Sequence, residues 1–325
     1  MRKFKVGIDS YSLKPLDLDP FELLDWATIN EAEGVQFSET PPQAGDKSFL
    51  RELSQYAAQN DLYLEWGGGE HIPFDIATGR PKNVAAINAK AAEQASLMGV
   101  RTIRSCSGGL MRWKKGSPST EEYLKEMAGS LRPLRPMLKD HGVILALETH
   151  FEFTTFELMR LFEMCDAGPD EYLGVCLDTM NLLTMLEDPV AATRRILPWV
   201  VTTHIKDGAI DLTPRGFVSF TAEAGKGLID FERILILLAE LPRRVNLSIE
   251  DHGGEFLIPI FDPAFLAEFP DLSVKELSVL LKMAADTRNL IDENEIAVLD
   301  RTRWPAMCED RVKRDLFAVK RMAGI

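Results

Sequence analysis

The chain has 325 residues, of which 46% are apolar and 27% charged; these proportions exclude a disordered polypeptide, and no linker-like stretch divides the sequence. The formal net charge of −13 opposes binding to nucleic acid or to an anionic membrane. The first residues, MRKFKVGIDSYSL, lack the apolar core of a signal peptide, and no stretch of about 18 apolar residues could cross a bilayer, so we expect a cytoplasmic protein.

Short β-rich runs recur along the chain and alternate with segments of helical periodicity. The runs are residues 4–10, 34–39, 62–66, 101–106, 143–149, 173–178, 200–206 and 245–250. The clearest helical segments are residues 20–32, 84–98, 120–140 and 230–241. This alternation requires parallel strands joined by crossover helices, and apolar runs such as VILAL suit a sheet that is buried on both faces. Eight such units predict an α/β fold of the (β/α)8 TIM barrel type.

An open, doubly wound sheet is the alternative fold. Such sheets usually carry a glycine-rich phosphate-binding turn after the first strand, whereas residues 7–13 read GIDSYSL. The sequence therefore disfavours a nucleotide-binding fold.

Two segments follow the eighth expected strand. Residues 251–273, which begin DHGGEFLIPIFD, form a long apolar loop, and we expect a lid over the core or a subunit contact there. Residues 274–325 form a C-terminal helical extension whose end, EDRVKRDLFAVKRMAGI, is amphipathic. We predict that residues 1–325 are a single barrel domain that includes this loop and this tail.

The four cysteines are widely scattered and show no CxxC spacing. They are Cys106, Cys165, Cys176 and Cys308. Their density is far below that of a secreted disulfide scaffold, so we expect reduced, structural thiols.

Polar residues gather where the expected strands end. In a (β/α)8 barrel these ends carry the chemistry, because their side chains converge over the mouth of the barrel. The last four strands run into Glu148, Asp178, His204 and Glu250. Three carboxylates and one imidazole suit one hard or borderline divalent cation. The oxygen-rich ligand set makes Mn²⁺ the first choice, with Mg²⁺, Co²⁺ or Zn²⁺ as alternatives.

Helix capping is the competing explanation for these carboxylates. Asp178, for example, could cap a helix that begins at Thr179. Capping explains neither His204 nor the late position of all four residues within apolar runs, so we favour the metal site.

Other candidates for catalysis and substrate binding lie near the same strand ends. His150 could face the substrate as a general acid or base, or could be a solvated loop histidine. His71 is a second catalytic candidate, and Glu250 could be both a ligand and a catalytic group. The expected substrate-binding residues are Glu39, Trp66, Glu70, Arg104 and Lys206.

The segment WGGGEHIPFD, residues 66–75, carries two of the expected substrate-binding residues and His71. Its glycines would allow a substrate to approach the backbone closely, or would simply form a tight strand-to-helix turn. We expect a substrate-facing loop here and keep the turn as an alternative.

Taken in order, five segments resemble the xylose isomerase-like barrels, a superfamily of sugar isomerases, ketose epimerases, inosose dehydratases and related endonucleases. They are LALETH, GVCLDTMN, TTHIKD, AGKGLIDF and LSIED, and the resemblance covers roughly residues 4–255. It implies that Glu148, Asp178, His204 and Glu250 bind the metal. Asn181 departs from the pattern of many epimerases, which place a histidine three residues after the metal aspartate.

Three further segments, ETHFEF, EWGGGEHIPFD and EDHGGEFLIPIFD, look like the catalytic subunit of bacterial C-deglycosylation enzymes. This resemblance implies a lyase that cleaves the carbon–carbon bond between a 3-oxo sugar and an aromatic aglycone, together with a small β-rich second subunit. The metal would polarise the C3 oxygen while His150 removes the C2 proton. His71, Glu250 or Lys206 would supply the second proton.

Two other functions stay open. A metal-dependent ketose isomerase or epimerase would use Glu148 and Glu250 as a paired acid and base. A non-catalytic sugar-binding barrel is the third function, because a fold alone does not establish activity, although the complete ligand set argues against it. Each function predicts a sugar-like small molecule as the ligand.

Overall fold

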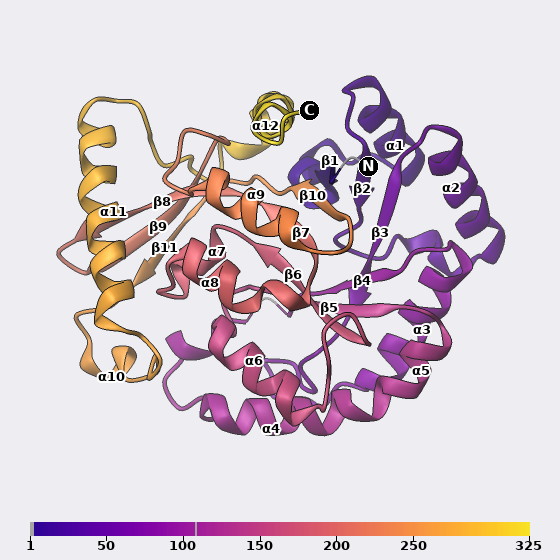
Figure 1. Ribbon diagram of the computed structural model, residues 1–325, viewed down its shortest axis with the longest axis horizontal. Coiled ribbons are helices and arrows are strands. Elements are labelled where there is room, and N and C mark those ends of the chain that lie inside the picture. The colour runs from indigo at the N-terminus through magenta and orange to yellow at the C-terminus, as the bar shows by residue number, and fades with distance from the viewer. Residues whose placement is uncertain (1–2, 108) are drawn as a thin grey trace.

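Eight parallel strands close into a barrel in the computed structural model, which describes residues 3–107 and 109–325 (Figure 1). The strands are β1 (Phe4–Asp9), β2 (Gly34–Gln36), β3 (Tyr63–Gly69), β4 (Thr102–Ser105), β5 (Ile144–Glu148), β6 (Leu173–Asp178), β7 (Val200–Ile205) and β10 (Val245–Ile249). Neighbours in this order are paired, and β10 pairs with β1 to close the sheet. The predicted TIM barrel is confirmed: seven of the eight predicted runs contain one of its strands, and the run 62–66 covers only the first part of β3.

Helices cover the outside of the barrel (Figure 1). They are α1 (Pro20–Ile29), α2 (Lys47–Gln59), α3 (Val84–Leu97), α4 (Thr120–Leu131), α5 (Arg135–Asp140), α6 (Thr155–Met164), α7 (Asn181–Thr184), α8 (Pro189–Ile196) and α9 (Phe231–Glu240). Capping boxes define three of the N-termini, in which Asp19, Ser119 and Thr154 each exchange hydrogen bonds with a glutamate three residues later. The predicted helix 120–140 is interrupted at Pro133 and Pro136, where proline provides no backbone N–H.

Short 3-10 helices complete the connections. They are η1 (Ser10–Leu16), η2 (Pro42–Gly45), η3 (Met111–Trp113), η4 (Arg132–Leu134), η5 (Leu197–Trp199) and η6 (Trp304–Ala306). Of these, η1 follows the first barrel strand directly and brings its residues to the barrel mouth.

A polar network fills part of the barrel interior. The Glu65 carboxylate accepts hydrogen bonds from Gln36 Nε2 at 2.6 Å and from Asn246 Nδ2 at 2.8 Å, and Thr202 also donates to it. Burial raises the pKa of Glu65 despite these three donors. The network joins β2, β3, β7 and β10 beneath the mouth of the barrel.

A second, three-stranded antiparallel sheet stands beside the barrel mouth and was not predicted. It is formed by β8 (Asp207–Thr213), β9 (Gly216–Ala222) and β11 (Glu255–Ile258), in the order β11-β9-β8. Helix α11 (Val274–Asp292) packs against β8 (Figure 1). The segment expected as a long loop, residues 251–273, therefore contains β11 and the short helix α10 (Pro263–Leu266).

The C-terminal helical extension is part of the barrel wall. Helix α12 (Cys308–Met322) packs against η1, β1 and β10, where the eighth helix of the barrel would lie. Its amphipathic pattern buries Val312, Leu316 and Val319. Arg311 anchors it, because its Nη2 donates to Asp251 Oδ1 at 2.8 Å. No helix within the described ranges is both long and apolar enough to cross a membrane.

Candidate metal centre and active site

Four side chains from neighbouring strands converge at the mouth of the barrel. They are Glu148, Asp178, His204 and Glu250, here called the tetrad. One ligand atom from each lies within 4.8 Å of those of the other three. His204 Nδ1 is 3.5 Å from Glu148 Oε1 and 3.6 Å from Glu250 Oε2. The structure thus brings together the four residues that the sequence proposed as metal ligands, and all four are buried.

Three members of the tetrad, Asp178, Glu148 and His204, each have one atom anchored by a protein contact and one atom without a hydrogen bond. Asp178 Oδ1 accepts a hydrogen bond from the backbone N–H of Asn181 at 2.8 Å. Glu148 Oε2 accepts one from Nε of Arg104 at 2.6 Å. On the far side of its ring, His204 Nε2 lies against Gln36 Oε1. Such secondary contacts orient the ligands in metal sites.

The free atoms of the tetrad point toward one another. Glu148 Oε1, Asp178 Oδ2, His204 Nδ1 and Glu250 Oε2 are buried and have no hydrogen-bond partner among the described residues. The Lys206 ammonium lies 2.8 Å from Asp178 Oδ2 and beside Glu250 Oε2, but not in hydrogen-bonding geometry. Buried polar atoms without a hydrogen bond are rare, and four around one point, two of them also facing the Lys206 ammonium, fit the donor set of a cation.

The electrostatics of the tetrad also fit a cation. Burial opposes ionisation of Glu148, but the Arg104 guanidinium and His204 outweigh this effect and hold the pKa of Glu148 below its ordinary value. Burial raises the pKa of Asp178, and the charges of Glu250 and Glu148 add to this against the opposing charge of Lys206. A bound cation would relieve this excess of negative charge.

The tetrad opens into a cavity of about 320 Å³. Its lining residues are Tyr11, Ser38, Glu39, Arg104, Cys106, Ser107, His150, Phe151, Lys206, Glu250, His252, Phe256 and Arg301. This volume is within the range of small-molecule sites. One part of the lining is ionic, and the other part is mostly aromatic.

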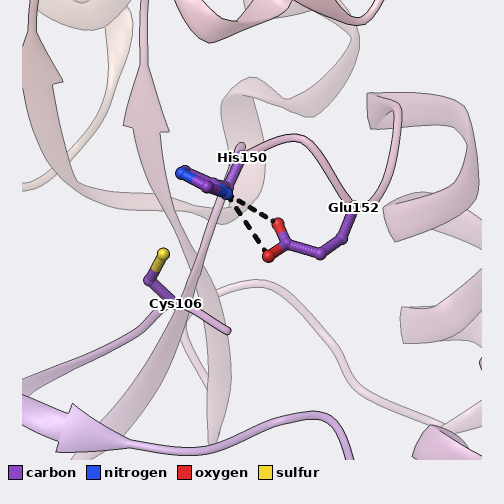
Figure 2. A group of neighbouring side chains, drawn as sticks. All are labelled: Cys106, His150 and Glu152. Carbon is purple, nitrogen blue, oxygen red and sulfur yellow. Dashed lines mark hydrogen bonds and ion pairs between the residues drawn. The ribbon is translucent and has the colours of Figure 1, made fainter. Parts of the chain in front are cut away.

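His150 forms part of the cavity wall and is held from behind by a carboxylate (Figure 2). Its Nδ1 lies 3.1 Å from Glu152 Oε2, while Glu152 Oε1 accepts the N–H of Gly109 at 2.7 Å. Cys106 directs its sulfur toward His150 from the end of β4 (Figure 2). Ligand atoms of these three residues also lie within 4.8 Å of one another, but Nδ1 of His150 is already paired with Glu152.

The charge of His150 depends on its neighbours. Burial alone would lower its pKa, but the nearby Cys106 and Glu152 outweigh burial and raise the pKa of His150 well above its ordinary value. A divalent cation in the tetrad would act in the opposite direction through charge repulsion.

Three of the expected substrate-binding residues line the cavity. Arg104 and Lys206 lie close to the tetrad, and each pairs with carboxylates of the tetrad. Glu39 lies at the rim, where its exposed carboxylate pairs with Lys14 at 2.9 Å.

Trp66, one of the expected substrate-binding residues, lies outside the cavity. Its side chain is fully buried against Phe37, and its indole N–H donates to Gln94 of α3 at 3.1 Å. The preceding residue, Glu65, faces the interior of the barrel. Side chains alternate along a strand, so Trp66 must face the surrounding helices.

Glu70 and His71 also lie outside the cavity lining. Glu70 accepts the N–H groups of His71 and Ile72, each at 2.9 Å, and pairs with Lys82 at 2.6 Å. His71 is buried, and its Nδ1 lies 2.7 Å from Ser105 Oγ. Both side chains fix the connection after β3, and their roles in substrate binding and catalysis stay predictions.

The glycines of residues 66–75 serve strand packing. Strand β3 continues to Gly69, so this part of the segment is not a loop. A Cβ on Gly67 would lie 2.4 Å from the carbonyl oxygen of Phe37 and 2.5 Å from that of Ser38. The close approach is therefore between neighbouring backbones of the barrel rather than to a substrate.

Several residues of the site were missed. Gln36 and Asp9 lie behind His204, and Glu152 lies behind His150. Cys106 was expected to be structural, yet it is partly exposed and lines the cavity; all four cysteines are free thiols. The polar ends of strands 1 and 2 were the available signal for Asp9 and Gln36, whereas nothing local marks Cys106.

The chain belongs to the xylose isomerase-like TIM barrel family, whose sequence model matches residues 24–279. It is 24% identical over 259 residues to the uncharacterized protein YihM of Escherichia coli (strain K12), covering 78% of this chain and 72% of that protein. It is 29% identical over 128 residues to 3-oxo-isoapionate decarboxylase of Pectobacterium atrosepticum, covering 38% of this chain and 45% of that enzyme.

A solved structure agrees with the fold. D-allulose 3-epimerase from Methylomonas sp. superposes with a TM-score of 0.64 at 14% identity, and the match covers 99% of both chains. At this level of identity the likeness shows the shared barrel fold. Both of these relatives with a named activity are enzymes.

Proposed function

We propose that this protein is a divalent-metal-dependent carbon–carbon lyase that cleaves the C-glycosidic bond of 3-oxo-C-glycosides. One observation carries the proposal: the free atoms of the tetrad meet beside a cavity whose wall contains His150. This arrangement combines a cation site with an imidazole, which suits removal of a proton next to a carbonyl group.

The tetrad would hold one divalent ion, with Mn²⁺ as the first choice because three of the four ligands are carboxylates. When bound, the ion would supply a Lewis acid for the carbonyl oxygen of the substrate. Arg104 and Lys206 balance the charge of the carboxylates and hold them in place.

The protein groups would move two protons. His150, in the neutral form that a cation in the tetrad would favour, would take the proton from C2 of the 3-oxo sugar. The electron pair of that C–H bond would form the C1–C2 double bond. The aryl carbon would leave C1 with the electron pair of the broken bond and accept a proton, giving the free aglycone and an unsaturated keto sugar. Of the three donors considered, Lys206 and Glu250 line the cavity and His71 does not.

A relative supports bond cleavage. The name 3-oxo-isoapionate decarboxylase describes loss of carbon dioxide from a 3-oxo compound, which also breaks a carbon–carbon bond. In addition, Asn181 stands where many epimerases carry a histidine, and here its backbone N–H anchors Asp178.

The second candidate is a ketose isomerase or epimerase. It is favoured by the barrel likeness to D-allulose 3-epimerase and by the two glutamates of the tetrad, Glu148 and Glu250, which could act as a paired acid and base. This function requires no site for an aglycone.

The two functions differ in their products. Purified protein, combined with any small subunit that co-purifies with it, would be incubated with an oxidised phenolic C-glucoside and, separately, with a free ketose. Each incubation would be run with and without chelator, and the products analysed by chromatography and mass spectrometry. The lyase should release the aglycone only when Mn²⁺ is available, and should leave the ketose unchanged. Ketose interconversion without aglycone release would establish the alternative, and no turnover of either substrate would favour a binding protein.

The proposed lyase includes a small β-rich second subunit. Affinity purification of the tagged chain from its native host should recover a small protein in constant ratio. Full lyase activity of the chain purified alone would remove the need for this subunit.

A further inference from the structure

The outer half of the mouth cavity is built from aromatic side chains that come from separate segments. Phe151, which follows β5, packs on Phe256 of β11 with a ring distance of 4.2 Å. Tyr11 of η1 meets the ring of His252 edge-on at 5.5 Å, and Trp304 stacks behind Tyr11 at 5.5 Å. The antiparallel sheet and the C-terminal extension therefore both contribute to this half.

Arg301 places a cation in the same half of the cavity. Its guanidinium donates to the hydroxyl oxygen of Tyr11 and forms no ion pair with any residue in the ranges 3–107 and 109–325. The other cations of the lining, Arg104 and Lys206, both pair with tetrad carboxylates. Only Arg301, among the described cationic side chains of the lining, lacks a counter-ion.

The aromatic half adjoins the tetrad. His252 Nε2 lies 3.3 Å from Lys206 Nζ, and Lys206 contacts Asp178 at 2.8 Å. A ligand whose sugar reaches the tetrad would thus extend its next group between the Tyr11 and Phe256 sides of the cavity.

We propose that this outer half is a subsite for a planar phenolic ring, and that Arg301 binds the oxygen anion of the phenol. Aromatic walls favour a flat ring, and an unpaired guanidinium favours a negative oxygen beside it. The inference rests on the proposed function for the sugar half and deepens it, because it names the residues that would hold the aromatic leaving group and the charge state in which they would bind it. It also assigns a role in substrate selection to the C-terminal extension.

The test uses a probe that cannot be cleaved. Binding of 4-nitrophenol, at a pH where it is ionised, and of neutral nitrobenzene would be measured by saturation-transfer NMR on the full chain, with and without chelator. Wild type should bind the phenolate more tightly than nitrobenzene. Arg301→Met should weaken phenolate binding roughly fivefold, as expected for a partly exposed charge pair, and leave nitrobenzene binding unchanged.

Two further variants control for folding. Arg301→Lys keeps the charge and should retain most of the phenolate binding, and Arg303→Met, which removes an exposed arginine outside this cavity, should behave like wild type. Equal binding of the phenolate to wild type and Arg301→Met, or no preference over nitrobenzene, would overturn the subsite. Since no bond is cleaved, phenolate binding without lyase activity would reject the proposed function but keep the subsite.

Discussion

At the scale of single residues, the tetrad shows how a cation site is built from anchored side chains. Asp178, Glu148 and His204 each use one atom for a protein contact, so the opposite atom is free to bind an ion. The sequence allowed prediction of the four residues because each ends an apolar strand. It did not reveal the anchors Gln36 and Asp9, because these come from strands distant in sequence and meet His204 only after the barrel closes.

Asp178→Asn should abolish metal binding. The neutral amide removes one anionic ligand, and wild type should contain about one divalent ion per chain while the variant contains almost none, as measured by elemental analysis. Chelator should lower the melting temperature of wild type, because ligand at about 100 times its dissociation constant contributes roughly 2.7 kcal/mol. Equal metal content in both proteins, or none in wild type, would contradict the tetrad as a metal site.

Glu152→Gln should reduce turnover by about 10- to 100-fold while metal content stays the same. The carboxylate fixes the His150 ring through Nδ1, and an amide could present the wrong group to that nitrogen. Activity and elemental analysis on the same preparation check this prediction. Loss of metal together with activity would assign Glu152 to the metal centre instead.

Arg195 lies between two buried carboxylates, with Nη1 and Nη2 each 2.7 Å from Glu187 and Glu276 respectively. Burial raises the pKa of Glu187 to about 7, although Thr155 and Arg195 oppose this. The folded-state pKa thus exceeds the unfolded value of about 4.3. The contribution of Glu187 to the unfolding free energy is fully present below about pH 4.3, and it is lost as the pH rises through 7.

Replacement of Glu187 by glutamine should flatten the pH dependence of the unfolding free energy. The difference in unfolding free energy between variant and wild type should change by up to about 3 kcal/mol from pH 4.5 to 7, as measured by urea unfolding. Glu163→Gln changes an exposed helical residue and serves as the control. Its unfolding free energy should change with pH in the same way as that of wild type. Parallel curves for Glu187→Gln would show that Arg195 keeps Glu187 ionised throughout.

At the scale of elements, the barrel strands were predictable and the second sheet was not. Strands that alternate with helices share one repeating pattern, whereas β8, β9 and β11 break it. Strand β11 lies far along the chain from β9, the one strand with which it pairs in the part of the chain that the structure describes. Local sequence therefore gives little sign of the pairing. The orientation of Trp66 was also not predictable from the sequence. It depends on whether Glu65, the preceding residue of β3, faces the interior of the barrel.

The glycines of β3 give the prediction at this scale. Gly67→Ala should destabilise the protein by about 1–3 kcal/mol, because its Cβ would collide with two backbone carbonyls of the preceding connection. Gly45→Ala is the matched control, since nothing lies within 4 Å of a Cβ there. Similar unfolding midpoints for the two variants would mean that the backbone after β2 can shift enough to accommodate a Cβ at Gly67.

At the scale of the whole molecule, α12 completes the barrel from the far end of the sequence. Its Arg311 forms a buried pair with Asp251, directly after the tetrad residue Glu250. The amphipathic pattern predicted a helix here, but its place beside β1 depends on contacts across the whole chain.

Arg311→Met should therefore lower the unfolding free energy by about 3–5 kcal/mol, because it leaves the buried charge of Asp251 unpaired. Arg314→Met removes a more exposed pair with Glu223 and should cost less than about 1 kcal/mol. Chemical unfolding of both variants compares them directly. A small effect at Arg311 would indicate that α12 is held by its apolar face alone.

The pairing of β1 with β10 also constrains how the protein is made. As the polypeptide leaves the ribosome, β1 can pair with β2 early, but its other edge has no neighbour until Val245–Ile249 emerges. The helix that covers this junction is synthesised later still. For most of translation the nascent chain therefore carries an open strand edge, the kind of surface that can pair with other chains before the barrel closes.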